Sequence, residues 1–163
     1  MIPRTEAIVV GAGIGGLAAA LALQKAGADV RVYEQAPQLG EVGAGLSISP
    51  NGALALRALG VLDEFRAHAY APEYQFVRHY QTARVLATVT RGDRLAETYG
   101  ERYYVIHRAD LHRVLADAVR ANDPDAIVTG QRALELRHDD DGVEVRFEGG
   151  LARRADLLIG RAS

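Results

Sequence analysis

The stretch AIVVGAGIGG, residues 7–16, is the most informative part of this 163-residue chain for predicting its fold. Its first four residues are apolar and mostly β-branched, which predicts a short strand that is buried on both faces. Gly11, Gly13 and Gly16 then match the pattern GxGxxG. In that pattern the first glycine permits a tight turn, the second admits a pyrophosphate close to the backbone, and the third lets a helix pack against the sheet.

A helix, a second strand and an acidic residue complete the expected unit. Ile14–Ala26 predicts the helix, which Gly27 ends, and its N-terminus would present free N–H groups to phosphates. Val30–Tyr33 predicts the second strand. Glu34 closes that strand at about 20 residues from the glycine pattern, where an acid binds the ribose hydroxyls and disfavours the 2′-phosphate of NADP. The sequence therefore predicts a right-handed βαβ unit for a dinucleotide.

Two simpler interpretations of the same residues stay open at this point. Glu34 could be a solvated carboxylate at a strand end, and the glycine loop could bind nothing. The pattern gains weight from its context, because a strand precedes it and a helix follows it.

Composition excludes several classes of function. The net charge is −2 with no basic block, so nucleic acid is not an expected partner. The chain has no cysteine, which excludes disulfides and thiolate sites, and its histidines lack the spacing of a metal site, so we expect no metal. The uncharged stretch 7–23 carries four glycines and is short for a membrane span, so we expect a cytoplasmic protein and no membrane partner.

Periodicity predicts the remaining elements. Gly40–Ile48 is expected to be mostly loop, and Ser49 and Pro50 are expected to cap and open a helix that stops at Gly60. Alternating residues from Tyr74 to Val89 predict a hairpin, which we assign to a second sheet; an edge hairpin of the first domain is the alternative. Further helices are expected at 61–68 and 110–120. Further strands are expected at 103–107, 126–129, 132–138, 143–147 and, as a buried strand, 155–160.

Four motifs, in order along the chain, resemble those of the single-component FAD-dependent aromatic-ring monooxygenases, the salicylate hydroxylase-like branch in particular. They are GAGIGG at 11–16, VYEQA at 32–36, GAGLSISPN at 43–51 and IHRADLH at 106–112. The resemblance implies an α/β fold, with a Rossmann-like FAD-binding domain over residues 1–163 that is truncated. It also implies that residues 72–91 are strands of an incomplete substrate domain.

The same resemblance implies the chemistry. FAD is the cofactor, NAD(P)H reduces it transiently, and one oxygen atom of O₂ is delivered to an electron-rich aromatic substrate. The choice between NADH and NADPH stays open, and a homodimer is a candidate assembly.

Cofactor-binding positions follow from the resemblance motif by motif. They are Gly11, Gly13, Gly15 and Gly16 at the pyrophosphate, Glu34 and Gln35 at the adenosine end, Gly43, Ala44 and Gly45 near the flavin, and Arg108 at a helix start. A surface arginine is the alternative for Arg108. We interpret His107 and His112 as structural, and no catalytic residue is assigned. Some relatives carry a histidine base where Ser47 stands, and serine does not titrate near neutral pH.

One departure from the family concerns the end of the sequence. Relatives continue the last strand into an Ala-Asp-Gly segment whose aspartate contacts FAD, whereas here the sequence reads RAS at 161–163. We therefore expect a truncated monooxygenase that is inactive alone. The alternatives are an NAD-linked oxidoreductase that shares only the βαβ unit, and a non-catalytic nucleotide-binding remnant.

Overall fold

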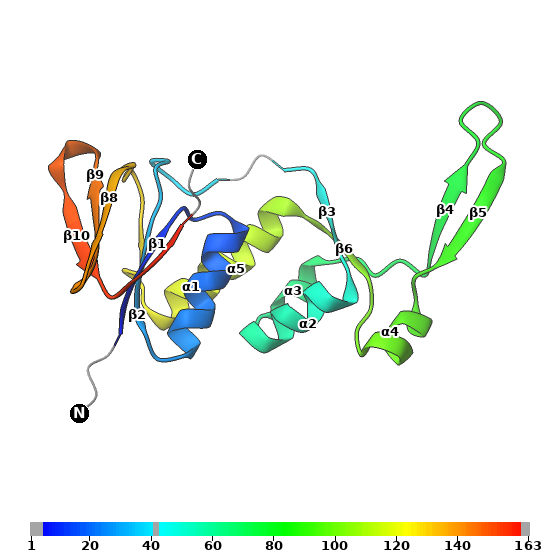
Figure 1. Ribbon diagram of the computed structural model, residues 1–163. Helices are drawn as coiled ribbons and strands as arrows, with labels where there is room; N and C mark the ends of the chain where they lie inside the picture. The colour runs from blue at the N-terminus through cyan, green and yellow to red at the C-terminus, as the bar shows by residue number, and fades with distance from the viewer. Residues whose placement is uncertain (1–4, 41–42, 161–163) are drawn as a thin grey trace. The chain divides into compact units, whose positions relative to one another are not determined.

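The computed structural model describes residues 5–40 and 43–160 (Figure 1). The chain divides into two compact units, one formed by residues 1–41 with 112–163 and the other by residues 42–111. Residues 161–163, where we expect the departure from the family, lie outside the described part. Within that part, no helix is long and apolar enough to cross a bilayer.

A parallel sheet forms the centre of the first unit, as the sequence predicts. Its strands, in spatial order, are β11 (Leu157–Gly160), β1 (Glu6–Val10), β2 (Asp29–Tyr33) and β7 (Ile127–Val128). Central strand β1 is buried at Ala7, Ile8 and Val9, which explains its run of apolar residues.

Two helices cover one face of this sheet. They are α1 (Ile14–Lys25), which packs on β1 and β2, and α5 (Arg108–Asn122). The Nε2 atom of Gln24 donates a hydrogen bond to the carbonyl oxygen of Val119 at 3.3 Å and so joins the two helices. Gly27 has a φ of +92° just after α1, so it ends that helix as expected.

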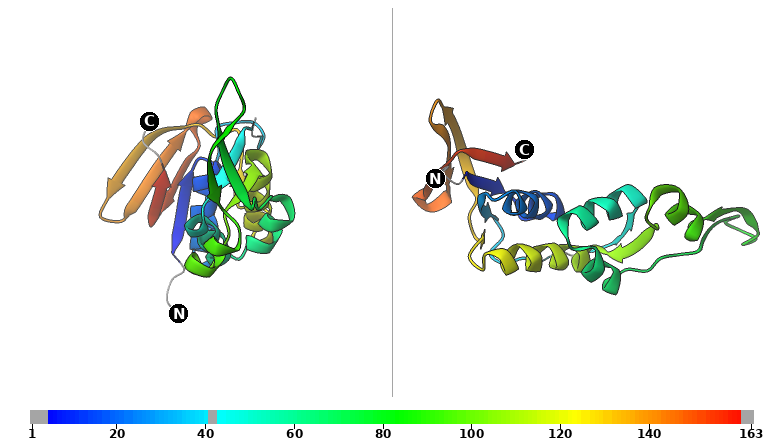
Figure 2. Two further views of the ribbon diagram at one scale, coloured as in Figure 1. Left: turned by 90° about the vertical axis from the view of Figure 1, so that its right-hand side faces the viewer. Right: turned by 90° about the horizontal axis from the view of Figure 1, so that it is seen from below.

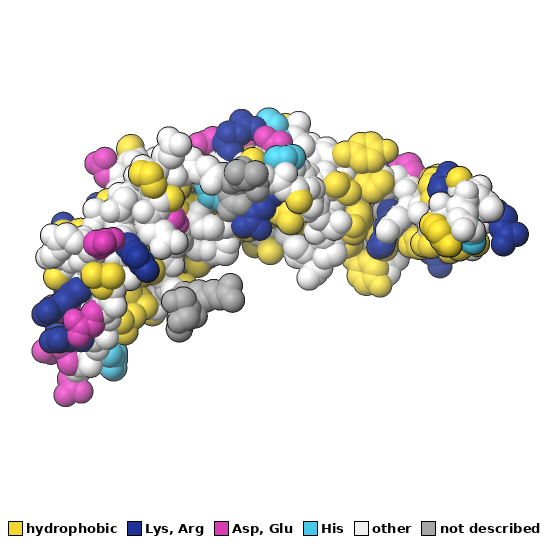
Figure 3. Space-filling model, turned by 90° about the horizontal axis from the view of Figure 1, so that it is seen from above, with side chains coloured by type: hydrophobic (Ala, Val, Ile, Leu, Met, Phe, Trp, Pro, Cys, Tyr) yellow, Lys and Arg dark blue, Asp and Glu magenta, His cyan; other side chains and the backbone are white. Residues whose placement is uncertain are grey.

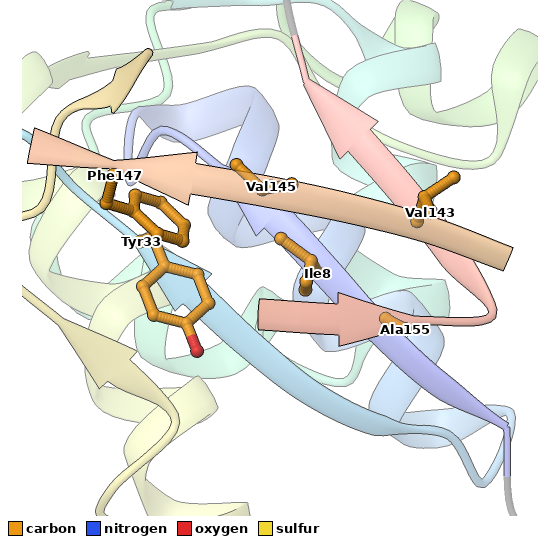
Figure 4. Close-up of a cluster of buried hydrophobic side chains, with 6 residues drawn as sticks. All are labelled: Ile8, Tyr33, Val143, Val145, Phe147 and Ala155. Atoms are coloured by element: carbon orange, nitrogen blue, oxygen red, sulfur yellow. The ribbon is translucent and has the colours of Figure 1, made fainter. Parts of the chain in front are cut away.

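An antiparallel sheet covers the opposite face (Figures 1 and 2). Its strands are β10 (Ala152–Ala155), β9 (Gly142–Phe147) and β8 (Ala133–Asp139), and a 3₁₀ turn at Glu148–Gly150 precedes β10. Figure 4 shows the core between the sheets, in which the rings of Tyr33 and Phe147 lie 4.5 Å apart between centroids.

The expected single strand at 155–160 is wrong. The chain leaves the antiparallel sheet at Ala155 and joins the parallel sheet at Leu157, with Asp156 between them. The Glu6 N–H donates to Asp156 Oδ2 at 2.8 Å, and the Asp156 N–H donates to the Glu6 carbonyl oxygen at 3.0 Å. These two bonds hold the crossing point, and β11 is an edge strand that is only partly buried.

Residues 42–111 form the second unit. Strands β3 (Gly45–Ile48) and β6 (Tyr104–His107) pair antiparallel, so the loop expected over 40–48 is wrong at its C-terminal end. Helices α2 (Pro50–Leu59) and α3 (Leu62–His68) follow, and α4 (Asp93–Tyr99) was not anticipated. Ser49 precedes α2 but makes no side-chain cap, because its Oγ donates to Asn51 Oδ1 at 2.5 Å instead.

A buried carboxylate joins the helices of this unit. Glu101, which is 2% exposed, accepts hydrogen bonds from Arg57, from Arg66 at 2.7 Å and from the Tyr104 hydroxyl at 3.1 Å. Burial by itself raises the pKa of Glu101, but the hydrogen bonds from Arg66 and Tyr104 and the charge of Arg66 outweigh it, so the net pKa is lowered.

The expected hairpin is confirmed as β4 (Tyr74–Arg78) and β5 (Val85–Thr90). Every residue of both strands is exposed, and the two strands form a sheet of their own. Figure 3 shows hydrophobic side chains gathered over this hairpin. Its assignment to a substrate domain stays a prediction.

Candidate functional site

The glycine turn after β1 has the geometry that its pattern predicts. Gly11 has a φ of +98°, and its N–H donates to the Tyr33 carbonyl oxygen at 2.8 Å. A Cβ on Gly16 would lie 1.9 Å from the Gly11 carbonyl oxygen, whereas a Cβ on Gly13 or Gly15 would meet nothing within 4 Å. Two of the glycines therefore shape the turn, and the other two leave space beside it.

Helix α1 begins at this open space. Gly13 is its N-cap residue, without a side-chain cap, and the first turn carries no acidic residue. The first intrahelical bond runs from the Leu17 N–H to the Gly13 carbonyl oxygen at 2.9 Å. The positive end of the helix dipole is therefore not compensated by a side chain of its own first turn, which suits an anionic phosphate.

Glu34 does not behave as a freely solvated carboxylate. Its Oε2 accepts a hydrogen bond from the Ala12 N–H at 2.7 Å, and its Oε1 accepts one from the Ala36 N–H at 2.9 Å. A carboxylate offers about four acceptor positions, so positions remain for ribose hydroxyls. Contact of Glu34 with a ribose stays a prediction, and the structure adds a second role in holding the glycine turn.

His112 holds the next peptide group of the turn, between Ala12 and Gly13. Its Nε2 donates to the Ala12 carbonyl oxygen at 2.6 Å, and the residue is 7% exposed. Ala12 is thereby fixed at its N–H by Glu34 and at its carbonyl oxygen by His112. Sequence reasoning missed this contact, because nothing in the local pattern links a histidine on α5 to a loop so far away in the chain.

Two pockets adjoin the turn. The larger, of about 500 Å³, opens beside the C-terminal ends of β1 and β2. It is lined by Val10, Gly11, Tyr33, Glu34, Gln35, Gln131, Arg132 and Ala133. The smaller, of about 130 Å³, is lined by residues that include Ala12, Gly13, Glu34 and His112. Gln131 and Arg132 had not been anticipated as site residues.

A second group of predicted residues lies in the 42–111 unit. The Arg108 N–H donates to the Ala44 carbonyl oxygen at 3.1 Å, and Gly45 pairs with His107 between β3 and β6. A Cβ on Gly43 would lie 2.7 Å from the His107 ring, so a side chain at this position would require that ring to shift. The structure therefore brings the 43–45 motif and the start of α5 together, although they are distant in sequence.

The described residues fit a dinucleotide at the first group. An uncapped helix N-terminus, two glycines with open space, and a carboxylate at a strand end match the requirements of a pyrophosphate and an adjoining ribose.

Comparison with known proteins agrees with this geometry. The family described as FAD binding domain matches residues 4–160. The 6-hydroxynicotinate 3-monooxygenase of Pseudomonas fluorescens is 40% identical over 153 residues, which is 93% of this chain and 39% of that protein. The 3-hydroxybenzoate 6-hydroxylase of Polaromonas naphthalenivorans is 36% identical over 94% of this chain and 38% of its own length.

Solved structures with FAD bound are also similar to this chain. The crystal structure of Klebsiella pneumoniae HpxO complexed with FAD and uric acid superimposes with a TM-score of 0.83 at 32% identity. The match covers 94% of this chain and 38% of that one. The chain thus spans about 39% of the length of the curated relatives it matches.

Proposed function

The chain belongs to the family of FAD binding domains, and from that premise we propose that it is the FAD-binding part of a flavoprotein monooxygenase that hydroxylates a small aromatic ring. The observation that carries the proposal is the clamped glycine turn. Glu34 and His112 fix the two peptide groups on either side of the Ala12 Cα, beside an uncapped helix N-terminus, which holds the turn ready for a phosphate group.

Each part of the chain has a role in this proposal. Gly13 and Gly15 leave room for the pyrophosphate, Glu34 binds the ribose, and Gln35 lies at the adenosine end. Gly43, Ala44, Gly45 and Arg108 serve the flavin side of the cofactor. FAD, when bound, supplies the redox chemistry that takes electrons from NAD(P)H and activates O₂.

The substrate class is proposed from the relatives. Their names specify hydroxynicotinate and hydroxybenzoate, and one related structure holds uric acid. We propose a small, hydroxylated aromatic or heteroaromatic ring. Ser47 supplies no titrating base near neutral pH, so the proposal assigns no proton transfer to that position. The homodimer, the cytoplasmic location and the substrate-domain assignment of residues 72–91 stay predictions.

Titration of the 163-residue chain with FAD tests the proposal. The wild-type chain is expected to bind FAD more tightly than NAD⁺. Glu34→Ala is expected to weaken FAD binding by about 1.5–3 kcal/mol, because hydrogen bonds to a charged group are lost. Glu148→Ala removes an exposed carboxylate from the 3₁₀ turn of the same unit and serves as the matched control.

Three outcomes distinguish the hypotheses. No FAD binding by the wild-type chain would contradict the proposal, and tighter binding of NAD⁺ would favour the NAD-linked alternative. FAD binding that Glu34→Ala leaves unchanged would contradict only the role given to Glu34.

A further inference from the structure

Two backbone segments that are distant in sequence meet beside the larger pocket at the glycine turn. The Gly130 N–H donates to the Ala36 carbonyl oxygen at 2.8 Å, and the Gln131 N–H donates to the Glu34 carbonyl oxygen at 2.8 Å. Gly130 has a φ of +70°, a conformation that favours glycine, and it leads the chain from β7 into Gln131. Gln131 is therefore fixed against the segment that carries the proposed ribose-binding acid.

The side chain of Gln131 carries an unsatisfied polar atom. Its Oε1 is buried and accepts no hydrogen bond from any described residue, and it is the one side-chain atom in this state within residues 5–40 and 43–160. A buried acceptor without a donor costs free energy, and native proteins rarely retain one without a reason. Because Gln131 lines the pocket, a ligand in that pocket is a natural source of the missing donor.

We propose that Gln131 recognises the adenine base of the cofactor, with its Oε1 accepting a hydrogen bond from the exocyclic amino group. This inference rests on the proposed FAD binding and assigns a residue that the glycine pattern does not. In a nucleoside the base is joined directly to the ribose, so a ribose at Glu34 places its base near Glu34 in the same pocket. Gln35 and Arg132, which line that pocket too, would stand beside the base.

The chemistry predicts a preference between two bases that differ in one group. Adenine carries an amino donor at C6, whereas hypoxanthine carries a carbonyl acceptor at the same position. The Oε1 atom of Gln131 would accept a hydrogen bond from the amino group of adenine. Opposite hypoxanthine it would face a carbonyl oxygen, which is also an acceptor. The chain is therefore expected to prefer ADP to inosine diphosphate.

Calorimetric titration of the 163-residue chain with ADP and with inosine diphosphate tests this. Wild type is expected to bind ADP about five- to tenfold more tightly, the worth of one hydrogen bond. Gln131→Met keeps the length of the side chain and removes the amide, so the preference should vanish through weaker ADP binding. Gln131→Glu offers acceptors only, without the amide donor that could turn toward hypoxanthine, so its preference for ADP should be at least as large as that of wild type.

The outcomes separate this inference from the function on which it rests. Equal wild-type affinities for the two nucleotides, or a preference that Gln131→Met leaves intact, would overturn the role of Gln131 while FAD binding stands. Failure of the wild-type chain to bind both ADP and FAD would overturn the proposed function and this inference with it. Gln81→Met, in the hairpin turn, is the matched control and should leave both affinities unchanged.

Discussion

Two phenylalanines show how differently the two units of this chain are built. Phe147, on β9 of the first unit, is 2% exposed and packs against Tyr33 between two sheets. Phe76, on β4 of the 42–111 unit, is 49% exposed on a hairpin whose strand residues are all exposed. The first unit therefore buries its aromatic rings between two sheets, whereas the second unit, which buries Phe65, leaves the apolar side chains of its hairpin uncovered.

This difference has a functional meaning. The features that suit a pyrophosphate and an adjoining ribose lie in the first unit, whose layered core can hold the glycine turn rigidly. The uncovered hairpin belongs to a chain that spans about 39% of the length of its curated relatives. Exposed aromatic and β-branched side chains of this kind mark surfaces that other protein usually covers.

The largest expected effect tests the comparison directly. Phe147→Ala should lower the free energy of unfolding by about 3–5 kcal/mol, because a fully buried ring is lost from the core. The same change at Phe76 should cost within about 0.5 kcal/mol, as is usual for exposed positions. Urea denaturation followed by circular dichroism measures the free energy of unfolding of both variants. Equal losses at the two positions would show that Phe147 and Phe76 do not differ in packing.

The second prediction concerns the buried charge that holds the 42–111 unit. Glu101→Gln should destabilise the chain by about 1.5–3 kcal/mol at neutral pH, because charged hydrogen bonds to Arg57 and Arg66 are weakened. The folded-state pKa of Glu101 is lowered. Its contribution is therefore present above the ordinary glutamate pKa of about 4.3 and is lost as pH falls through the folded-state value.

Urea denaturation of wild type and Glu101→Gln between neutral and acidic pH measures this second effect. The gap in stability between the two proteins should narrow on acidification. A gap that is independent of pH would show that the carboxylate charge contributes nothing to this unit.

A smaller effect is expected at His112, which acts on the first unit through the glycine turn. His112→Leu should weaken FAD binding by about 0.5–1.5 kcal/mol, because the Ala12 carbonyl oxygen loses its donor. His112→Gln can still donate from an amide nitrogen and should recover much of the affinity. Equal loss in both variants, measured by FAD titration, would show that His112 serves packing alone.

Local patterns in the sequence predicted the first unit well. The strand at residues 7–10, the glycine turn and the helix depend on neighbouring residues, and all three form as expected. Strand β3 was missed because Gly45–Ile48 becomes a strand only through its pairing with β6. The predicted side-chain cap at Ser49 is also absent, because the Ser49 hydroxyl donates to the Asn51 side chain and not to the helix backbone.

The candidate site was predicted only in part, because some of its residues form a local pattern and others meet only in the folded chain. Glycines at fixed offsets and an acid at a strand end are visible in a linear sequence. The contacts of His112 with Ala12 and of Gln131 with Glu34 join residues about 100 positions apart, and only the folded chain brings them together.

The affinity of Gly13→Val for FAD shows whether the glycine turn is the phosphate site. Gly13 has a φ of −70°, and a Cβ there meets nothing within 4 Å, so the variant should fold with near wild-type helix content. Its side chain would occupy the space that we assign to the pyrophosphate. We expect no FAD binding by the variant at concentrations that saturate the wild-type chain. Wild-type affinity in a folded Gly13→Val variant would contradict the claim that the glycine turn is the phosphate site.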